Sequence, residues 1–536
     1  MIILKKNILN FIITLIIGAV LFYMFLPPIN ISSLTFWIFV VVLLFIYGML
    51  SFISSDNVYK AFNATRTTIN LSKNIYYVTF GVSIIICGIV LINVACSPLF
   101  NAKSYSKRIT INESSDFLKD VSEVNFKSIP LLDRDSSEKL GDRVMGQMSE
   151  YVSQYYVSDQ YTQINYNNDI IRVTPLEYDG FIKWIANRKK GIGAYITVNS
   201  VNGEAKLVKL EKGMRYMPSA LFNENLKRKL RFLYPTAIFG TSKFEIDNDG
   251  KPYWITPIYK YTGVSMKTRV AGVIILDPVT GNAKKYNVDS IPSWVDNAYN
   301  PDLVIEQVDD WGTYRDGFIN SIFGQKNVVK TTEGYNYLAI NDDIYLYTGI
   351  TSVLSDESNL GFILSNLRTG KTTFYPVAGA EEYSAMASAK GQVQQMGYDS
   401  TFPLLINLNN RPTYLVSLKD AAGLVKMYGF VDVADYQKVV VTDSSKGIEV
   451  AAQNYLSSVD NEISDELLEK KTITIKRITT ATKNGDTSFY ITDENNNKYI
   501  ASIKLSDKLP FISAGEKLEI AYYNKNEEVV NIVKVY

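Results

Sequence analysis

The sequence predicts an α+β protein held in a membrane by three N-terminal helices, and three observations predict this class. Three apolar runs of about 20 residues occupy the first hundred of the 536 residues, and each is long enough to cross a ~30 Å hydrocarbon core as a helix. Residues 123–459 alternate between helical and strand-like spacing, with turns at intervals. Residues 472–536 contain strand and turn patterns only.

The membrane anchor is expected over residues 1–100, with spans at 8–26, 34–53 and 75–96. Only helices and closed barrels satisfy every backbone N–H and C=O group in lipid, and these runs lack the alternation of barrel strands. A cleaved signal peptide is the rival interpretation of the first run, but the Leu-Pro-Pro that follows it is a poor cleavage site. The sequence therefore predicts three transmembrane helices.

Basic residues predict the orientation of these helices. Lys5 and Lys6 flank the first span, the loop 54–74 carries three more basic residues, and the loop between the first two spans has none. Basic loops stay in the cytoplasm, so an odd number of crossings places the chain beyond Cys96 outside. Three basic residues just past the third span weaken this bias without reversing it. We expect a multi-pass plasma-membrane protein with a cytoplasmic N-terminus and a large extracytoplasmic region.

Composition narrows the chemistry of that region. The chain has no His, which excludes Ser-His-Asp and Cys-His nucleophile systems and His metal ligands, and both Cys residues fall in the third span. Five of the 55 Lys and Arg residues and one of the 54 Asp and Glu residues lie in the first hundred, so the remainder has a net charge of −3. This even mixture argues against nucleic acid as a partner. We expect no cofactor, no metal site and no catalytic residues.

A unit of one helix followed by three antiparallel strands is predicted about four times in residues 123–459, after a polar linker over 101–122. The turn between the last two strands recurs at Gly203, Gly281 and Gly370, and then near Ala434. Gly supplies the positive φ that tight hairpin turns need. The expected helices cover 136–152, 218–233, 301–323 and 380–395. Each unit would bury one sheet face under its helix, and neighbouring units are expected to pair into lobes.

The C-terminal part is predicted to be a separate small β-barrel. A helix over 447–459 and a linker helix over 460–471 precede five short strands in residues 472–536. Five strands of this length suggest an OB-like barrel, with an SH3-like barrel as the alternative. Many such barrels bind nucleic acid, but nine basic and eight acidic residues form no positive stripe here. A protein-contact or capping role is favoured.

One stretch combines aromatic and acidic residues and is a candidate site. Paired carboxylates beside aromatic rings are what a glycosidase needs, one acid to protonate the leaving oxygen and one to attack or to activate water. At helical spacing the aromatic residues fall on one face and most of the acids elsewhere, as in a packed helix with a solvated acidic face. We therefore interpret the stretch as a candidate interaction surface, not an active site. Its residues are Trp294, Asp309, Asp310, Trp311 and Arg315.

Several motifs resemble known families. Residues 129–134 (Ile-Pro-Leu-Leu-Asp-Arg), 172–176 (Arg-Val-Thr-Pro-Leu), 276–281 (Leu-Asp-Pro-Val-Thr-Gly) and 291–296 (Ile-Pro-Ser-Trp-Val-Asp) resemble an uncharacterised family of multi-pass membrane proteins from low-GC Gram-positive bacteria and their large phages. The units, in which an aliphatic strand leads to Asp or Asn and then Thr-Gly, are similar to PepSY-type modules. Those modules are associated with peptidase propeptides and envelope regulators, so the resemblance implies binding or inhibition.

These features together lead us to expect a non-enzymatic, membrane-anchored protein that binds a protein or peptide partner at the cell envelope. Two alternatives stay open at this point. The chain could be a structural subunit of a membrane complex whose contacts are made by the three helices, or an envelope hydrolase that uses carboxylates such as Glu306 and Asp309.

Overall fold

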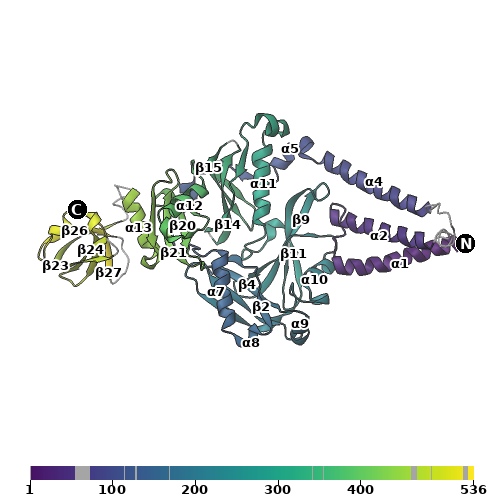
Figure 1. Ribbon diagram of the computed structural model, residues 1–536, viewed down its shortest axis with the longest axis horizontal. Coiled ribbons are helices and arrows are strands. Elements are labelled where there is room, and N and C mark those ends of the chain that lie inside the picture. Colours follow the sequence, from purple (N-terminus) through teal and green to yellow (C-terminus); the bar gives the residue numbers. More distant parts are fainter. Residues whose placement is uncertain are drawn as a thin grey trace.

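The chain folds into three long apolar helices at one end, four mainly antiparallel sheets in the middle and a small barrel at the opposite end (Figure 1). The three helices are called the membrane helices below, because their length and composition suit a bilayer. Residues 98–536 are called the globular region below. This mixed α+β architecture confirms the predicted class. The computed structural model describes residues 2–54, 73–113, 115–126, 129–167, 169–340, 342–353, 355–459, 468–483, 486–522 and 529–536.

The three N-terminal helices match the predicted spans closely. They are α1 (Ile2–Phe25), α2 (Leu34–Ile53) and α4 (Lys73–Ala95). All three are long and apolar enough to cross a membrane. α2 packs against both α1 and α4. The basic loop used to predict the orientation lies almost entirely outside the described residues.

The segment expected to be a polar linker, 101–122, carries structure instead. It contains most of α5 (Pro98–Ser106), the short strand β1 (Ile111–Asn112) and α6 (Phe117–Asp120). β1 pairs in parallel with a strand of the third sheet, and Phe117 is 2% exposed in the core there. A few apolar side chains spaced among polar ones are enough to fix a segment against an existing core, and composition alone does not show this.

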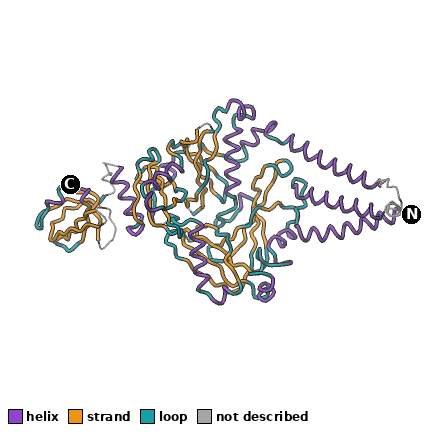
Figure 2. The backbone as a smooth tube through the Cα atoms, viewed as in Figure 1, coloured by secondary structure: helices purple, strands orange, loops and turns teal. Residues whose placement is uncertain are grey.

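Each of the four sheets has two short strands in addition to the predicted three, and these two short strands lie along the same edge of one long strand. In every sheet two short strands pair antiparallel with the same long strand, which then continues into two further antiparallel strands. The short strands were missed because two to five residues show no measurable period. Figure 2 shows all four sheets gathered between the membrane helices and the barrel.

The strand bounds are as follows. The first sheet has β2 (Tyr155–Val157), β3 (Thr162–Tyr166), β4 (Asp169–Tyr178), β5 (Ile192–Asn199) and β6 (Ala205–Met214), and the second has β7 (Ile238–Phe239), β8 (Lys243–Ile246), β9 (Pro252–Thr262), β10 (Lys267–Leu276) and β11 (Ala283–Tyr286). The third has β12 (Val329–Thr331), β13 (Asn336–Ile340), β14 (Asp343–Ser352), β15 (Ser355–Asn366), β16 (Thr372–Tyr375) and β17 (Gly379–Ala380), besides β1. The fourth has β18 (Asp399–Ser400), β19 (Leu404–Leu408), β20 (Arg411–Lys419), β21 (Val425–Asp432) and β22 (Val439–Asp443).

The helices that follow α5 and α6 largely match the predicted pattern, with three differences, of which the first is that the helix expected over 136–152 is interrupted at residues 147–148. They are α7 (Arg134–Gly146), α8 (Ser149–Val152), α9 (Phe181–Asn187), α10 (Leu226–Leu233), α11 (Pro301–Tyr314), α12 (Glu382–Gly391) and α13 (Ile448–Val459). The helix expected from residue 218 begins only at Leu226, because the Asn225 side chain caps it by accepting the Arg228 N–H. α11 ends at Tyr314, not at 323, and a π-helical turn, Asn320–Gly324, follows.

The last hairpin of each sheet is built in the same way. An Asn or Asp ends the preceding strand, and its N–H donates across the hairpin in all four sheets: Asn199, Asp277, Asn366 and Asp432. The carbonyl of the next residue accepts N–H groups from the segment before the helix of that same unit. Three of the four turns contain a positive-φ glycine: Gly203, Gly281 and Gly370. The fourth turn is one residue longer and has none.

The cores show how the sheets pair. Residues of the first and second sheets form one shared hydrophobic core, and residues of the third and fourth form another. α11 covers the opposite face of the third sheet with Val304, Val308 and Trp311. Two-sided burial of this kind requires apolar residues on both faces of the central strands, which explains their long hydrophobic runs.

Residues 469–535 form a closed five-stranded barrel, which confirms the small C-terminal barrel. Its strands are β23 (Glu469–Lys483), β24 (Asp486–Asp493), β25 (Lys498–Ser502), β26 (Lys517–Tyr522) and β27 (Val529–Val535). The barrel encloses its own core. The expected linker helix falls outside the described residues over 460–467, and its last three residues belong to β23 instead.

Candidate functional site

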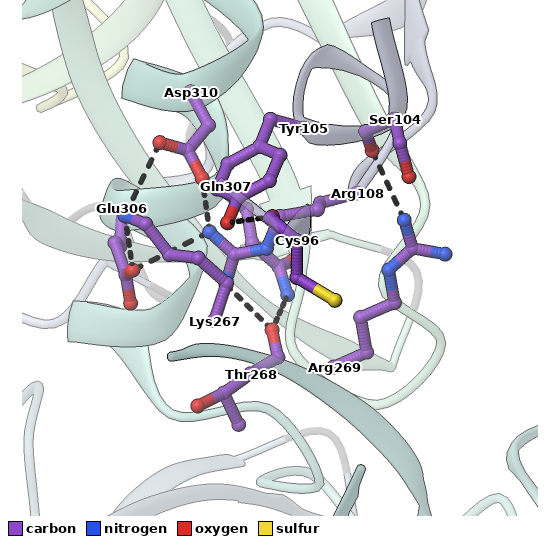
Figure 3. A network of polar contacts seen from close by, with 10 residues as sticks. All are labelled: Cys96, Ser104, Tyr105, Arg108, Lys267, Thr268, Arg269, Glu306, Gln307 and Asp310. Carbon is purple, nitrogen blue, oxygen red and sulfur yellow. Dashed lines mark hydrogen bonds and ion pairs between the residues drawn. The ribbon is translucent and has the colours of Figure 1, made fainter. Parts of the chain in front are cut away.

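A buried cluster of charged residues lies where the third membrane helix enters the globular region. Three segments that are distant in the sequence meet there: α5, the hairpin between β9 and β10, and α11 (Figure 3). The last turn of α4 is fastened to this hairpin, because the Asn93 amide accepts the Val264 N–H at 2.8 Å and donates to the Val264 carbonyl at 3.3 Å. We call the cluster of Arg108, Lys267, Glu306 and Asp310 the junction network.

Arg108 is the centre of the junction network. Its side chain is 1% exposed, and Nη1 forms ion pairs with Asp310 and, at 3.3 Å, with Glu306. Nη2 donates to the Thr268 carbonyl at 2.6 Å. A buried guanidinium is stabilised when charged or carbonyl groups accept its hydrogen bonds, and both terminal nitrogens of Arg108 have such acceptors, whereas its buried Nε has no partner among the described residues. Arg108 therefore links the end of α5 to both α11 and the β9–β10 hairpin.

Lys267 completes the charge balance from the other side. Its Nζ lies 2.5 Å from Glu306 and 3.2 Å from Asp310. Glu306 and Asp310 are four residues apart on α11 and so share one face. Burial acts to lower the pKa of Lys267, but hydrogen bonds and charges from Glu306 and Asp310 outweigh it, so the pKa is raised. Two cations and two carboxylates thus form a cluster with no net charge. This cluster holds three segments of the chain together.

The first two membrane helices are fastened to the same unit through the loop that joins them. The Ile29 N–H donates to the Pro235 carbonyl at 2.8 Å, and the Ser265 N–H donates to the Ser32 carbonyl at 2.9 Å. Arg231 of α10 donates through Nε to the Leu26 carbonyl at 3.0 Å. Consequently the ends of all three membrane helices that face the globular region are hydrogen bonded to the second sheet and its helix.

Four of the five predicted surface residues lie on or just after α11, but they face different environments. Asp310 and Trp311 are only 5% and 7% exposed, so they do not contribute to an accessible surface in this fold. Asp310 belongs to the junction network, and Trp311 packs in the core below α11. A helix covered by a sheet on one face and by α5 on another leaves few side chains free.

The other predicted residues lie closer to the surface. Asp309 accepts hydrogen bonds from the Thr331 N–H and hydroxyl at 2.8 and 3.0 Å, and burial raises its pKa. Arg315 lies over the Trp311 ring at 4.9 Å and donates to a main-chain carbonyl. Trp294 is not with them, because it packs against Tyr253 on the second sheet with ring centroids 5.0 Å apart.

A second pair of carboxylates, Glu245 and Asp296, is buried where the first three sheets meet. Glu245 accepts the N–H groups of Asp296 and Asn297 at 2.9 and 3.0 Å, and Asp296 accepts the Asn165 N–H at 2.7 Å. Both acids are at most 1% exposed. Burial raises the pKa of Glu245 to about 7, and burial together with the nearby Glu245 charge raises that of Asp296. The pair ties loops together and offers no exposed oxygen to a substrate.

Sequence reasoning missed the junction network, although part of its signal was present. Arg108 was used only as a charge beside the third span, and Lys267 was not singled out. The acids at positions i and i+4 of α11 showed that two carboxylates share a face. Which cations they meet depends on how α5 and β10 are placed.

Further observations describe what the site does not contain. In the described part of the chain, no three or more His, Cys, Asp or Glu residues are grouped so that they could hold a metal ion. Cys87 and Cys96 are free thiols in α4 and directly after it. Comparisons of the sequence with models of protein families and with curated proteins found no match.

Proposed function

We propose that this chain is a non-enzymatic, membrane-anchored protein whose extracytoplasmic globular region binds a protein or peptide partner at the cell envelope. The observation that carries the proposal is the fastening of the globular region to the ends of all three membrane helices, through the junction network and the α1–α2 loop. Such fastening suits a platform held at a fixed height and orientation above the bilayer, where it can meet a partner in the envelope.

The same contacts support the proposed orientation. The α1–α2 loop and the end of α4 both touch the globular region, so they lie on its side of the bilayer. The N-terminus and the loop between α2 and α4 then lie on the other side, where most of the basic flanking residues are found. These contacts and the basic residues support the proposal that the globular region lies outside the plasma membrane.

The four sheets are proposed to be copies of one PepSY-like unit. The shared hairpin supports this, since the carbonyls of Ser200, Pro278, Leu367 and Val433 accept N–H groups from the equivalent pre-helix segments. A second feature recurs in two units. A Cβ added to Gly281 would lie 2.4 Å from the Tyr216 ring, and one added to Gly370 would lie 2.4 Å from the Tyr299 ring. Repeated units present extended surfaces, which suits binding.

The barrel is proposed to be OB-like and not SH3-like. β25 pairs in parallel with β27, and β23 pairs with both β24 and β26. A barrel made only of consecutive hairpins contains antiparallel pairs alone, so a parallel pair indicates a crossover between the third and fifth strands, as in a Greek-key barrel.

The surface proposed to contact the partner is the apolar turn that follows α11. Ile319, Ile322 and Phe323 are 73%, 50% and 83% exposed. Adjacent exposed apolar side chains of this size mark interaction sites in soluble regions. This turn, with Arg315 at its start, replaces the buried Asp310 and Trp311 as the candidate contact surface.

Site-specific photo-crosslinking in the native cells tests the proposal. A photoreactive phenylalanine analogue placed at Phe323 of the full chain should give an adduct with a defined protein, identified by mass spectrometry. Phe511 on the barrel is equally exposed, at 83%, and serves as the matched position. An adduct specific to Phe323 supports the proposed surface. Absence of protein adducts at both positions contradicts partner binding by the globular region.

The orientation is tested separately by labelling. Lys251 is 65% exposed, and Lys251→Cys can be studied in a chain whose two native cysteines are replaced by serine. A membrane-impermeant maleimide should label this cysteine in intact cells. Labelling that appears only after permeabilisation would place the globular region in the cytoplasm and reverse the proposal.

A structural role within a membrane complex is the second candidate. It is favoured by α4, in which no residue of the candidate span is buried inside the protein. A chain with the globular region deleted would keep its partner if the helices made the contacts. The hydrolase alternative finds less support, because Glu306 and Asp310 are ion paired and Asp309 is hydrogen bonded to Thr331.

A further inference from the structure

A cavity of about 560 Å³ lies where α1 and α2 meet α10 and the second sheet. Its volume is in the range of small-molecule sites. One wall is apolar and consists of membrane-helix side chains, among them Leu21 of α1 and Ile38, Phe39 and Val42 of α2. Lys227 and Arg231 of α10 line the other end.

The cavity crosses the boundary between membrane and water. Val42 is eight residues along α2 from its first residue, Leu34, which places it about 12 Å inside the helix at 1.5 Å per residue. Arg231 donates to the Leu26 carbonyl, one residue past the end of α1 at Phe25, and Lys227 lies one turn before Arg231 on α10, so both cations belong to the end of α1 that adjoins the globular region. The cavity therefore suits a molecule with a polar group near Lys227 and Arg231 and an apolar part against the membrane helices. Lipids have these two parts.

The polar end of the cavity is cationic. Arg231 is 3% exposed, and its hydrogen bonds go to the carbonyls of Leu26 and of three residues after α10, not to a carboxylate. None of these bonds uses Nη2, which leaves that nitrogen for a ligand. Lys227 is exposed and has neither an ion pair nor a hydrogen bond to any residue the structure describes. The described lining contains no Asp or Glu.

The two cations are placed to act together. Lys227 and Arg231 are four residues apart on α10, so they lie on one face of the helix. The whole helix, Leu-Lys-Arg-Lys-Leu-Arg-Phe-Leu, has four basic residues and no acid. A site of two unneutralised cations at the depth of lipid head groups favours a phosphate, and basic residues near a bilayer surface attract anionic lipids.

We propose that this cavity binds an anionic phospholipid of the leaflet adjoining the globular region. Its phosphate lies between Lys227 and Arg231, and its acyl chains lie against Leu21, Ile38, Phe39 and Val42. The bound lipid fills the space between the membrane helices and α10 and adds to the contacts that hold the globular region at the surface. The inference goes beyond the proposed function and does not depend on a protein partner or on which side of the membrane this leaflet lies.

The test uses the full chain in nanodiscs of phosphatidylcholine that contain a small fraction of phosphatidylglycerol with a photoreactive acyl chain. After illumination, mass spectrometry should locate the label on the cavity side of α1 and α2, at residues such as Leu21 and Val42. Lys227→Gln should lower this labelling about five-fold, since one basic residue at the surface contributes a factor of this size to anionic-lipid binding.

Two further variants separate binding in the cavity from general attraction of lipid to the helix. Lys229→Gln removes the same charge from the same helix, but Lys229 lies over the Tyr216 ring at 5.1 Å and does not line the cavity, so labelling should change less than two-fold. Val42→Phe fills the apolar end without altering charge and should also lower labelling. Thermal unfolding of each variant is compared with that of the native chain, to check that the fold is intact.

Three results would overturn the proposal. Equal losses in Lys227→Gln and Lys229→Gln would indicate general attraction of anionic lipid to a basic helix. Equal labelling by a phosphatidylcholine analogue would indicate unselective lipid around the helices. Displacement of the photoreactive lipid by millimolar inorganic phosphate would indicate a site for a free anion and not for a lipid.

Discussion

Replacing Arg108 by methionine is expected to loosen the junction between the membrane helices and the globular region while the rest of the globular region stays folded. Methionine keeps most of the side-chain length but removes the charge and every N–H donor. Asp310, whose side chain is 7% exposed, then has only Lys267 at 3.2 Å as a partner. The Thr268 carbonyl keeps its hydrogen bond from Gln307 at 3.1 Å.

The magnitude follows from these contacts. Removing one partner of a buried ion pair costs about 3–5 kcal/mol, because the other charge is left uncompensated. Lys267 still compensates Asp310 in part, and its own side chain is 27% exposed, so the loss is expected at the lower end, about 3 kcal/mol. A loss of this size changes the docking equilibrium of α5 by more than about 100-fold, since 1.4 kcal/mol is a factor of ten.

Hydrogen exchange measured by mass spectrometry on the full chain in detergent checks this prediction. Exchange of amides in α5 and in the β9–β10 hairpin should speed up strongly, while amides of the barrel serve as the internal reference. Lys209→Met is the matched control, because the Lys209–Glu150 pair is 64% and 63% exposed and should matter little.

A second substitution tests whether the uncompensated carboxylate causes the loss of protection. Asp310→Asn in the Arg108→Met background removes the uncompensated carboxylate and should restore part of the protection. The reasoning is refuted if Arg108→Met leaves exchange in α5 unchanged, or if α5 and the barrel lose protection together.

Three further predictions concern pH, backbone and domain structure. Burial and the nearby Glu245 charge raise the pKa of Asp296, and burial raises that of Glu245 to about 7. Because these folded-state pKa values lie above those of unfolded carboxyl groups, at about 4, the protein loses stability as pH rises from about 4 towards the folded values. Asp296→Asn should therefore gain stability relative to the native chain between about pH 4 and pH 8, with the smallest difference near pH 4 in urea unfolding. Gly370→Ala should lower the free energy of unfolding more than Gly447→Ala does. Both positions have positive φ, 71° and 85°, but a Cβ at 370 meets a tyrosine ring whereas a Cβ at 447 meets open space, so Gly447→Ala should cost about 1 kcal/mol. Equal losses in denaturant titrations would contradict the packing argument. Deleting residues 468–536 should leave the calorimetric unfolding of the remaining chain unchanged, because the barrel core contains only barrel residues.

The features that the sequence predicted well depend on local pattern. The three membrane helices follow from runs of apolar residues, and the long strands and hairpin turns follow from alternation and from glycine at positions such as Gly203 and Gly281. The five barrel strands were predicted for the same reason. In each case the residues that decide the structure are near one another in the chain.

The features that were missed depend on distant neighbours. α10 begins eight residues later than Pro218 suggested, because Asn225 supplies the cap. The segment that contains Phe117 was expected to be a linker, but it packs into the core of the third and fourth sheets. The paired short strands are held by the long strand beside them and carry no period of their own.

By itself the sequence determined that this chain has three apolar helices, a region of alternating helices and antiparallel strands, and a small terminal barrel, because period and turn chemistry act over a few residues. Only the tertiary structure decided which charges face one another. Arg108 meets Asp310 across 202 positions and the Thr268 carbonyl across 160, and Arg231 reaches Leu26 across 205. Ion pairs, cavities and head-group sites require such distant groups to converge in space, and that convergence is a property of packing.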